Sequence, residues 1–171
     1  MTDTPPYPIA SSVRQVAGLS IALALCFGTA FLGAMASIKA PTFYAQLARP
    51  DWAPPAWLFG PVWTTLFIMM AIASWLVWRR GGLAAQRTPL VLFLAQLVFN
   101  ALWSWLFFAW QLGGLALGDI IVMWLLIAAC IVTFWRTSTL AGALLVPYIA
   151  WVSFAGFLNF TLWQLNPQIL G

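Results

Sequence analysis

The chain has 171 residues, of which 64% are hydrophobic and 6% are charged, and it carries a net charge of +4. A soluble domain averages about 25% charged residues, so this chain lacks the polar side chains to cover a water-facing surface. Histidine is absent, which excludes imidazole metal ligands, His-dependent catalytic triads and a proximal-His haem site. We expect an integral membrane protein with no metal and no other cofactor.

Long apolar stretches with few or no charges predict the membrane-spanning elements. Five of them have the roughly 20 apolar residues that a spanning helix needs: 15–38, 57–78, 89–111, 116–136 and 140–165. They are continuously apolar and do not alternate as barrel strands do, and a helix satisfies its own backbone in lipid. The sequence predicts an all-α membrane protein, a five-transmembrane-helix bundle over 15–166, with tails at 1–14 and 167–171.

The first apolar segment, 15–38, is too long for the apolar region of a signal peptide, and little positive charge precedes it. We therefore expect a retained helix. Its stretch GTAFLGAMAS offers small residues for close contact with a neighbouring helix.

The next segment, 39–56, is predicted to be an extramembrane loop rich in proline and tryptophan. The stretch RPDWAPPAWLFGPVW, residues 49–63, is dense in prolines, which stop helices, and in aromatic surface, which is costly in water. Two interpretations remain open. The loop is either a stiff lid that closes an apolar pocket at the bundle mouth, or an interfacial loop that only anchors helix ends.

Polar side chains inside the third span are costly in lipid, so their positions are informative. Gln96, Asn100 and Ser104 recur every four residues and form one stripe, with Trp103 beside it. These groups either hydrogen-bond neighbouring helices or orient a guest in a mostly apolar cavity.

The fifth span has a similar stripe of Trp151, Ala155 and Asn159, with Tyr148 one turn before. The same two interpretations apply to it. Pro147 is expected to kink this helix, and kinks open space in helical bundles.

The fourth span, 116–136, holds one carboxylate. If the helix is extended back to residue 115, Asp119 falls in its first turn, where the helix dipole stabilises negative charge. A proton relay is the alternative role.

Five crossings divide the basic residues unequally between the two sides. One side carries Arg14, Arg79, Arg80, Arg87 and Arg136, and the other carries Lys39 and Arg49. The positive-inside rule then predicts a cytoplasmic N-terminus. Because membrane orientation accounts for the basic charge, no nucleic-acid partner is expected, and a bacterial cytoplasmic membrane is the expected location.

Three motifs carry a family resemblance. ARPDWAPPAWLFGPVWTTLF, QLVFNALWSWLFF and LLVPYIAWVSFAGFLNF, in this order and spacing, resemble the TspO/MBR family of tryptophan-rich sensory proteins and translocator proteins, over about residues 15–166. The resemblance implies a five-helix bundle, a homodimer, and a pocket under the loop after the first helix. It also implies porphyrin or similar hydrophobic ligands, bound as ligand and not as prosthetic group, and a sensory, regulatory or trafficking role.

The resemblance also implies pocket residues. The positions that match the family pocket are Tyr44, Trp63, Asn100, Trp103, Tyr148, Trp151 and Ala155. The lid interpretation adds Trp52, and Lys39 or Arg49 are candidates to bind porphyrin propionates.

Two other functions follow from the resemblance. Some bacterial relatives degrade porphyrin in light and oxygen with tryptophans like Trp63 and Trp151, so the resemblance leaves enzymatic activity of this chain open. The chain has no acid/base pair for conventional catalysis. A transporter of small hydrophobic molecules is the other alternative. The animal sterol motif is missing, because Phe160 stands at its tyrosine position and no basic residue follows.

Overall fold

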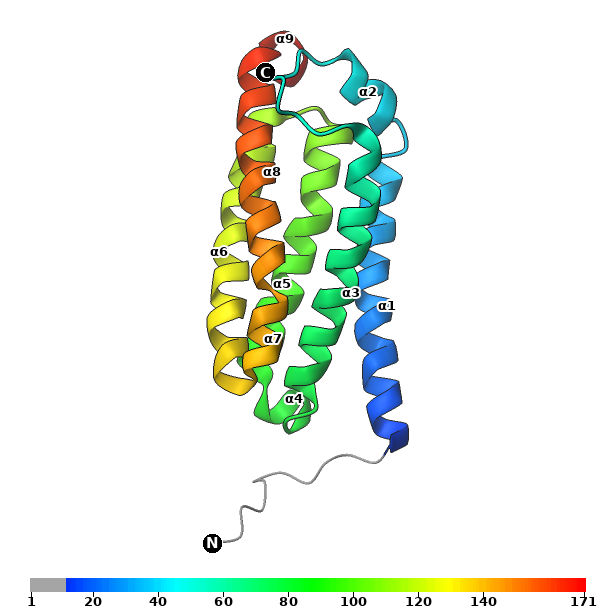
Figure 1. Cartoon of the computed structure of the whole chain (residues 1–171), viewed down its shortest axis with the longest axis vertical. Helices are drawn as coiled ribbons and strands as arrows, with labels where there is room; N and C mark the ends of the chain where they lie inside the picture. The colour runs from blue at the N-terminus through cyan, green and yellow to red at the C-terminus, as the bar shows by residue number, and fades with distance from the viewer. Residues whose placement is uncertain (1–11) are drawn as a thin grey trace, which may run out of the picture.

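The computed structural model describes residues 12–171, which form a bundle of long helices (Figure 1). Five helical spans are long and apolar enough to cross a membrane, which confirms the predicted all-α fold with five transmembrane helices. Their helices are α1 (Ser12–Ala36), α3 (Phe59–Trp78), α5 (Arg87–Ser104), α6 (Gly113–Thr137), α7 (Thr139–Leu144) and α8 (Val146–Leu165). A 3₁₀ turn, η1 (Ala56–Leu58), precedes α3, and a π-helix, η2 (Trp105–Ala109), continues α5.

Three short helices lie in segments predicted as loops or tails. They are α2 (Ala40–Gln46), α4 (Gly82–Ala85) and α9 (Pro167–Leu170). Proline stands within the first two positions of α2 and of α9, where its missing N–H costs nothing and its fixed φ suits a helix. At these two sites proline therefore lies at the start of a helix, within segments that were predicted as a loop and a tail.

Two boundaries also differ from the prediction. Helix α1 begins at Ser12, so residues 12–14 of the predicted tail are helical, whereas residues 1–11 lie outside the described part of the chain. Helix α6 begins at Gly113, which places Asp119 beyond the first turn and contradicts the expected first-turn position. Asp119 is buried there, and neither carboxylate oxygen has a hydrogen-bond partner among residues 12–171.

The fifth span is interrupted near its proline, as predicted. Helix α7 ends at Leu144 and α8 begins at Val146, one residue before Pro147. The break lets the span change direction between its two parts.

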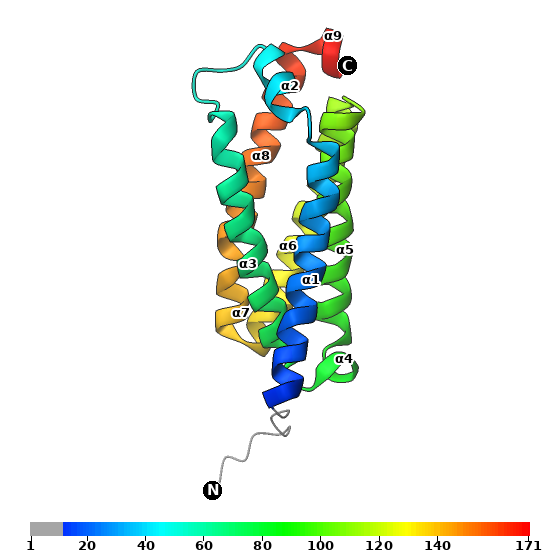
Figure 2. The same ribbon diagram turned by 90° about the vertical axis from the view of Figure 1, so that its right-hand side faces the viewer.

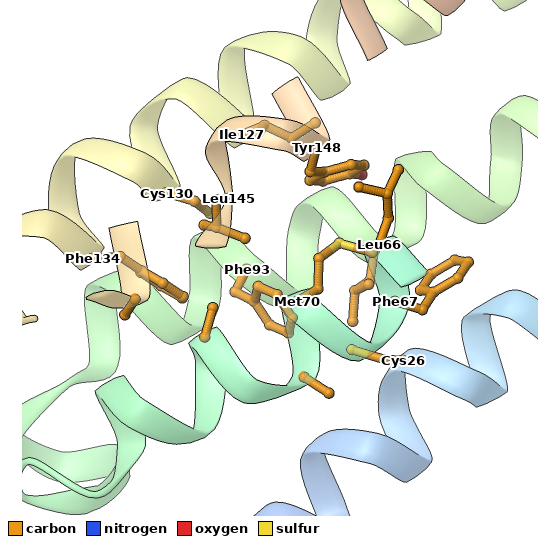
Figure 3. Packing of buried hydrophobic residues seen from close by; sticks show 14 of the residues in the cluster. Cys26, Leu66, Phe67, Met70, Phe93, Ile127, Cys130, Phe134, Leu145 and Tyr148 are labelled. Atoms are coloured by element: carbon orange, nitrogen blue, oxygen red, sulfur yellow. The ribbon is translucent and has the colours of Figure 1, made fainter. Parts of the chain in front are cut away.

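The spans form a closed ring. Helix α1 packs against α3 and α5, α5 packs against α6, α6 packs against α8, and α7 closes the ring against α3. Figure 3 shows part of the shared core, in which Met70, Phe93 and Phe134 meet side chains from the other spans. Large apolar side chains also cover the outside of the ring, such as Val98 and Leu125, which are 65% and 58% exposed. An outer surface of this kind suits lipid.

The two ends of the bundle differ in charge. The start of α1 and α4 lie at one end, and α2, α9 and the C-terminus lie at the other (Figure 1). The arginine-rich end includes Arg14 over the ring of Trp78 at 5.9 Å and Arg79 over the ring of Trp75 at 4.9 Å. Tryptophan and arginine together favour the headgroup level of a membrane.

Gly18 lets α1 approach α3 closely at the arginine-rich end. A Cβ at this position would overlap the ring of Trp78. We expect Gly18→Leu to lower stability by about 1–3 kcal/mol through overpacking. Thermal unfolding in detergent measures the effect.

Gly28 on the same helix is the matched control, because nothing lies within 4 Å of a Cβ built there. Gly28→Leu is expected to keep or slightly raise the melting temperature, since glycine is a poor helix former. Equal melting temperatures for the two variants would contradict close α1–α3 packing at Gly18.

Candidate functional site

A cavity of about 520 Å³ lies at the α2 end of the bundle. Side chains from α1, α2, α3, α5, η2 and α8 line it, and most of them are apolar. Its walls are rich in aromatic rings, among them Phe31, Phe59, Phe67 and Phe108. No lining residue is acidic or basic, so the cavity is built to bind by contact and not by charge.

The π-helix η2 shapes one wall. The N–H of Trp110 donates to the carbonyl of Trp105 at 2.8 Å, one residue further than in an α-helix. Phe107 and Phe108, adjacent in the sequence, both line the cavity. The ring of Trp103 stacks on Phe107 at 5.4 Å and meets the ring of Phe108 edge-on at 5.6 Å. Such π turns are common at functional sites, and no proline or glycine in this stretch predicted it.

The segment after α1 is fixed over the cavity end by Tyr44. Its hydroxyl donates to the carbonyl of Pro54 at 3.0 Å, and its ring packs edge-on against Phe59 at 5.6 Å. The guanidinium of Arg49 lies over the Tyr44 ring at 4.9 Å. Burial raises the pKa of the Tyr44 phenol above 10, and the charge of Arg49 opposes that rise.

Asn166, at the end of α8, holds the same segment. Its side chain accepts from the Ala48 N–H at 2.8 Å and donates to the Ala48 carbonyl at 2.9 Å. Two backbone groups of the loop are thus paired with one side chain, and the loop has a defined position across the bundle end.

Four of the predicted site residues line the cavity together. They are Tyr44 from α2, Trp63 from α3, Trp103 from α5 and Ala155 from α8. These residues are far apart in the sequence, so the fold itself creates the site.

Asn100 and Tyr148 lie beside the cavity and do not line it. The Asn100 amide donates to the Tyr148 hydroxyl at 2.9 Å, and that hydroxyl donates to the carbonyl of Gln96 at 2.7 Å. These bonds favour the bundle-stabilising interpretation of the third-span stripe. A ligand role for Asn100 and Tyr148 stays a prediction.

The remaining predicted residues do not line the cavity. The ring of Trp151 packs against Phe59, a lining residue, at 5.9 Å. Trp52 stacks on Phe157 at 5.0 Å and is 44% exposed. Lys39 is exposed before α2, and the guanidinium of Arg49 is over Tyr44.

The main residues that sequence reasoning missed are phenylalanines. A phenylalanine that faces the cavity and one that faces lipid give the same hydropathy, so no polarity contrast marks them. The available signal was the four-residue spacing of Phe27 and Phe31, which both line the cavity. The small residues nearby do make a helix contact, because a Cβ on Gly33 would lie 3.1 Å from the Ser104 hydroxyl.

Asn159 joins the cavity wall to three helices. It lines the cavity, accepts from the Trp103 indole N–H at 3.1 Å, and donates to the Gly113 carbonyl at 2.9 Å. The two bonds fix the orientation of the Trp103 ring. The wall is therefore held in place before any ligand arrives.

Comparison with known proteins agrees with this architecture. Residues 20–164 match the model of the TspO/MBR family. The chain is 42% identical over 159 residues to the "Tryptophan-rich protein TspO" of Chlorobaculum tepidum, covering 90% of this chain and 99% of the relative. It is 38% identical to the "Tryptophan-rich sensory protein" of Cereibacter sphaeroides, covering 84% and 88%. It is 40% identical to the human "Translocator protein", covering 72% and 75%. A match over most of the chain, with a five-span helical fold, establishes that this membrane protein belongs to the TspO/MBR family.

Proposed function

We propose that the protein binds a porphyrin or a similar flat hydrophobic molecule in the cavity at the α2 end, and that it acts as an intramembrane receptor in sensing, regulation or trafficking. The observation that carries the proposal is the apolar, aromatic-walled cavity of about 520 Å³. Ligand pockets commonly measure about 300–1,000 Å³ and combine apolar walls with few polar groups. The names "Tryptophan-rich sensory protein" and "Translocator protein" of two relatives support such a role.

Aromatic walls suit a flat macrocycle, because stacked rings gain dispersion energy over a large area. Trp63 and Trp103 supply the largest of these surfaces. The propionate groups of a porphyrin would lie toward the α2 end, within the region of Lys39 and Arg49, where charge-assisted hydrogen bonds are available. The cation of Arg49 would then exchange its contact with the Tyr44 ring for a carboxylate.

The segment over the cavity fits a lid. Its hydrogen bonds from Tyr44 and Asn166 hold it in place, and a segment that is already ordered loses less entropy when a ligand binds. By the positive-inside rule, the arginine-rich end is cytoplasmic and the lid lies on the opposite side. A bacterial cytoplasmic membrane and a homodimer remain our expectations.

Titration of protoporphyrin IX into the protein in nanodiscs, followed by porphyrin fluorescence, tests the proposal. We expect Trp63→Ala to weaken binding by roughly tenfold, the effect of about 1.4 kcal/mol of lost contact. The matched control is Trp110→Ala, because Trp110 is 53% exposed and does not line the cavity. An unchanged affinity in Trp63→Ala would contradict binding in this cavity.

One observation favours a second function, light- and oxygen-dependent degradation of the bound porphyrin. Trp63 lines the cavity, and Trp151 reaches its wall through Phe59. An indole next to an excited porphyrin can supply an electron, and oxygen is the oxidant. Illumination with oxygen should then give a new absorbing product with the wild type and much less with Trp63→Phe. The same product with both proteins would contradict a role of Trp63 in degradation and would support only the binding proposal.

A further inference from the structure

Exposed lining residues on α1 and α3 indicate that the cavity opens on its side, between these two helices. Figure 2 shows these two helices converging toward the arginine-rich end and diverging toward α2. Phe27 and Phe31 of α1 line the cavity yet are 40% and 65% exposed. Gly60 and Thr64 of α3 also line the cavity and are exposed.

The opposite wall is closed. Phe107 of η2 and Leu158 of α8 line the same cavity and are 2% and 4% exposed. The exposed lining residues therefore lie on α1, on α2 and on the span formed by η1 and α3, whereas the η2 and α8 side of the cavity is closed.

The rim of the opening is apolar and includes a residue without a side chain, Gly60. Nothing lies within 4 Å of a Cβ built on Gly60. The Thr64 hydroxyl donates to the Gly60 carbonyl of its own helix at 2.9 Å, so it is not an unpaired donor. Such a rim presents no polar barrier to an apolar group.

The surroundings of this opening are set by the fold. Phe27 and Phe31 lie within the span Ser12–Ala36, and Gly60 and Thr64 lie within the span Ala56–Trp78. In a membrane, lipid hydrocarbon faces this flank. Apolar space left empty forfeits dispersion contacts, and water there would lack polar partners.

We propose that the side opening between α1 and α3 is a binding site for one hydrocarbon chain of a bilayer lipid. The chain passes between Phe31 and Thr64 and occupies the cavity against the buried back wall. The lipid headgroup stays at the membrane interface near α2. This inference rests on the cavity and its exposed flank and does not depend on the identity of the proposed ligand.

Photo-crosslinking tests the site directly. The protein is placed in nanodiscs with phosphatidylcholine that carries a diazirine in one acyl chain, and the labelled residues are identified by mass spectrometry. We expect labelling of Phe107 and Leu158, which only a chain inside the cavity can reach, as well as outward-facing Leu125. Labelling confined to outward-facing residues would overturn the proposal.

Two neighbouring threonines provide matched variants. Thr64→Phe fills the opening, whereas Thr65→Phe adds the same ring to an exposed position that does not line the cavity. The Thr65 hydroxyl also bonds to its own helix, to the Pro61 carbonyl at 2.9 Å. Labelling of Phe107 should fall by roughly tenfold in Thr64→Phe only, as steric exclusion predicts. Equal labelling of Phe107 in the two variants would overturn access by this route, and unchanged melting temperatures in nanodiscs show that both are folded.

Adding protoporphyrin IX separates this inference from the proposed function. Labelling of Phe107 that disappears on addition supports both, because the two ligands then share one space. Labelling that persists supports the lipid site and counts against porphyrin in this cavity. Porphyrin binding without any Phe107 labelling overturns the lipid site and leaves the proposed function standing.

Discussion

Ala155→Phe should weaken porphyrin binding by at least roughly a hundredfold, which corresponds to about 2.7 kcal/mol. Ala155 lines the cavity from α8, and its small side chain leaves the space that the macrocycle would fill. A phenyl ring at this position takes part of that volume, and close-packed walls do not yield to make room. Titration of protoporphyrin IX by porphyrin fluorescence in nanodiscs measures the change.

Ala150→Phe is the control for this effect. Ala150 is on the same helix, is exposed, and does not line the cavity. It should retain the wild-type affinity. If Ala155→Phe binds porphyrin as tightly as Ala150→Phe does, the ligand lies elsewhere.

Asn159→Leu should lower the free energy of unfolding by about 1–3 kcal/mol. The substitution removes the acceptor of the Trp103 indole N–H and the donor to the Gly113 carbonyl. Asn159 is 1% exposed, so water does not replace these partners. Thermal unfolding in detergent or nanodiscs measures the loss, and a weaker porphyrin affinity should accompany it because the Trp103 ring is no longer fixed.

Thr161→Val, on the same helix, is the control that tests whether the loss of any polar side chain would lower stability as Asn159→Leu does. The Thr161 hydroxyl bonds only to the Phe157 carbonyl of its own helix, at 2.9 Å. Its replacement should change the melting temperature little. A similar loss in both variants would mean that Asn159 does not join the helices in the way its bonds indicate.

The spans were predictable because length and hydropathy alone define a membrane helix. Shorter features were not, since their causes are local. Helix α2 starts at Ala40 with Pro41 in its first turn, and composition does not separate a proline that begins a helix from one that ends it. The π turn at Trp105 has no residue signature, although it places Phe107 and Phe108 in the same wall.

The candidate site was predictable where polarity or family motifs marked it. Trp63, Trp103 and Ala155 do line the cavity. Asn100 and Tyr148 have their polar groups paired with each other, and a sequence stripe does not reveal which partner a polar group will choose. The phenylalanines of the cavity wall have the same hydropathy as phenylalanines that face lipid, so only three-dimensional packing identifies them.

The double hydrogen bond between Asn166 and Ala48 joins residues 118 positions apart. It can form only after the ribosome has made α8 and Asn166, so the segment over the cavity end is fixed late relative to the other spans during synthesis. Until then, the aromatic interior is open at that end. Closure of the cavity end is thus tied to synthesis of the chain through Asn166.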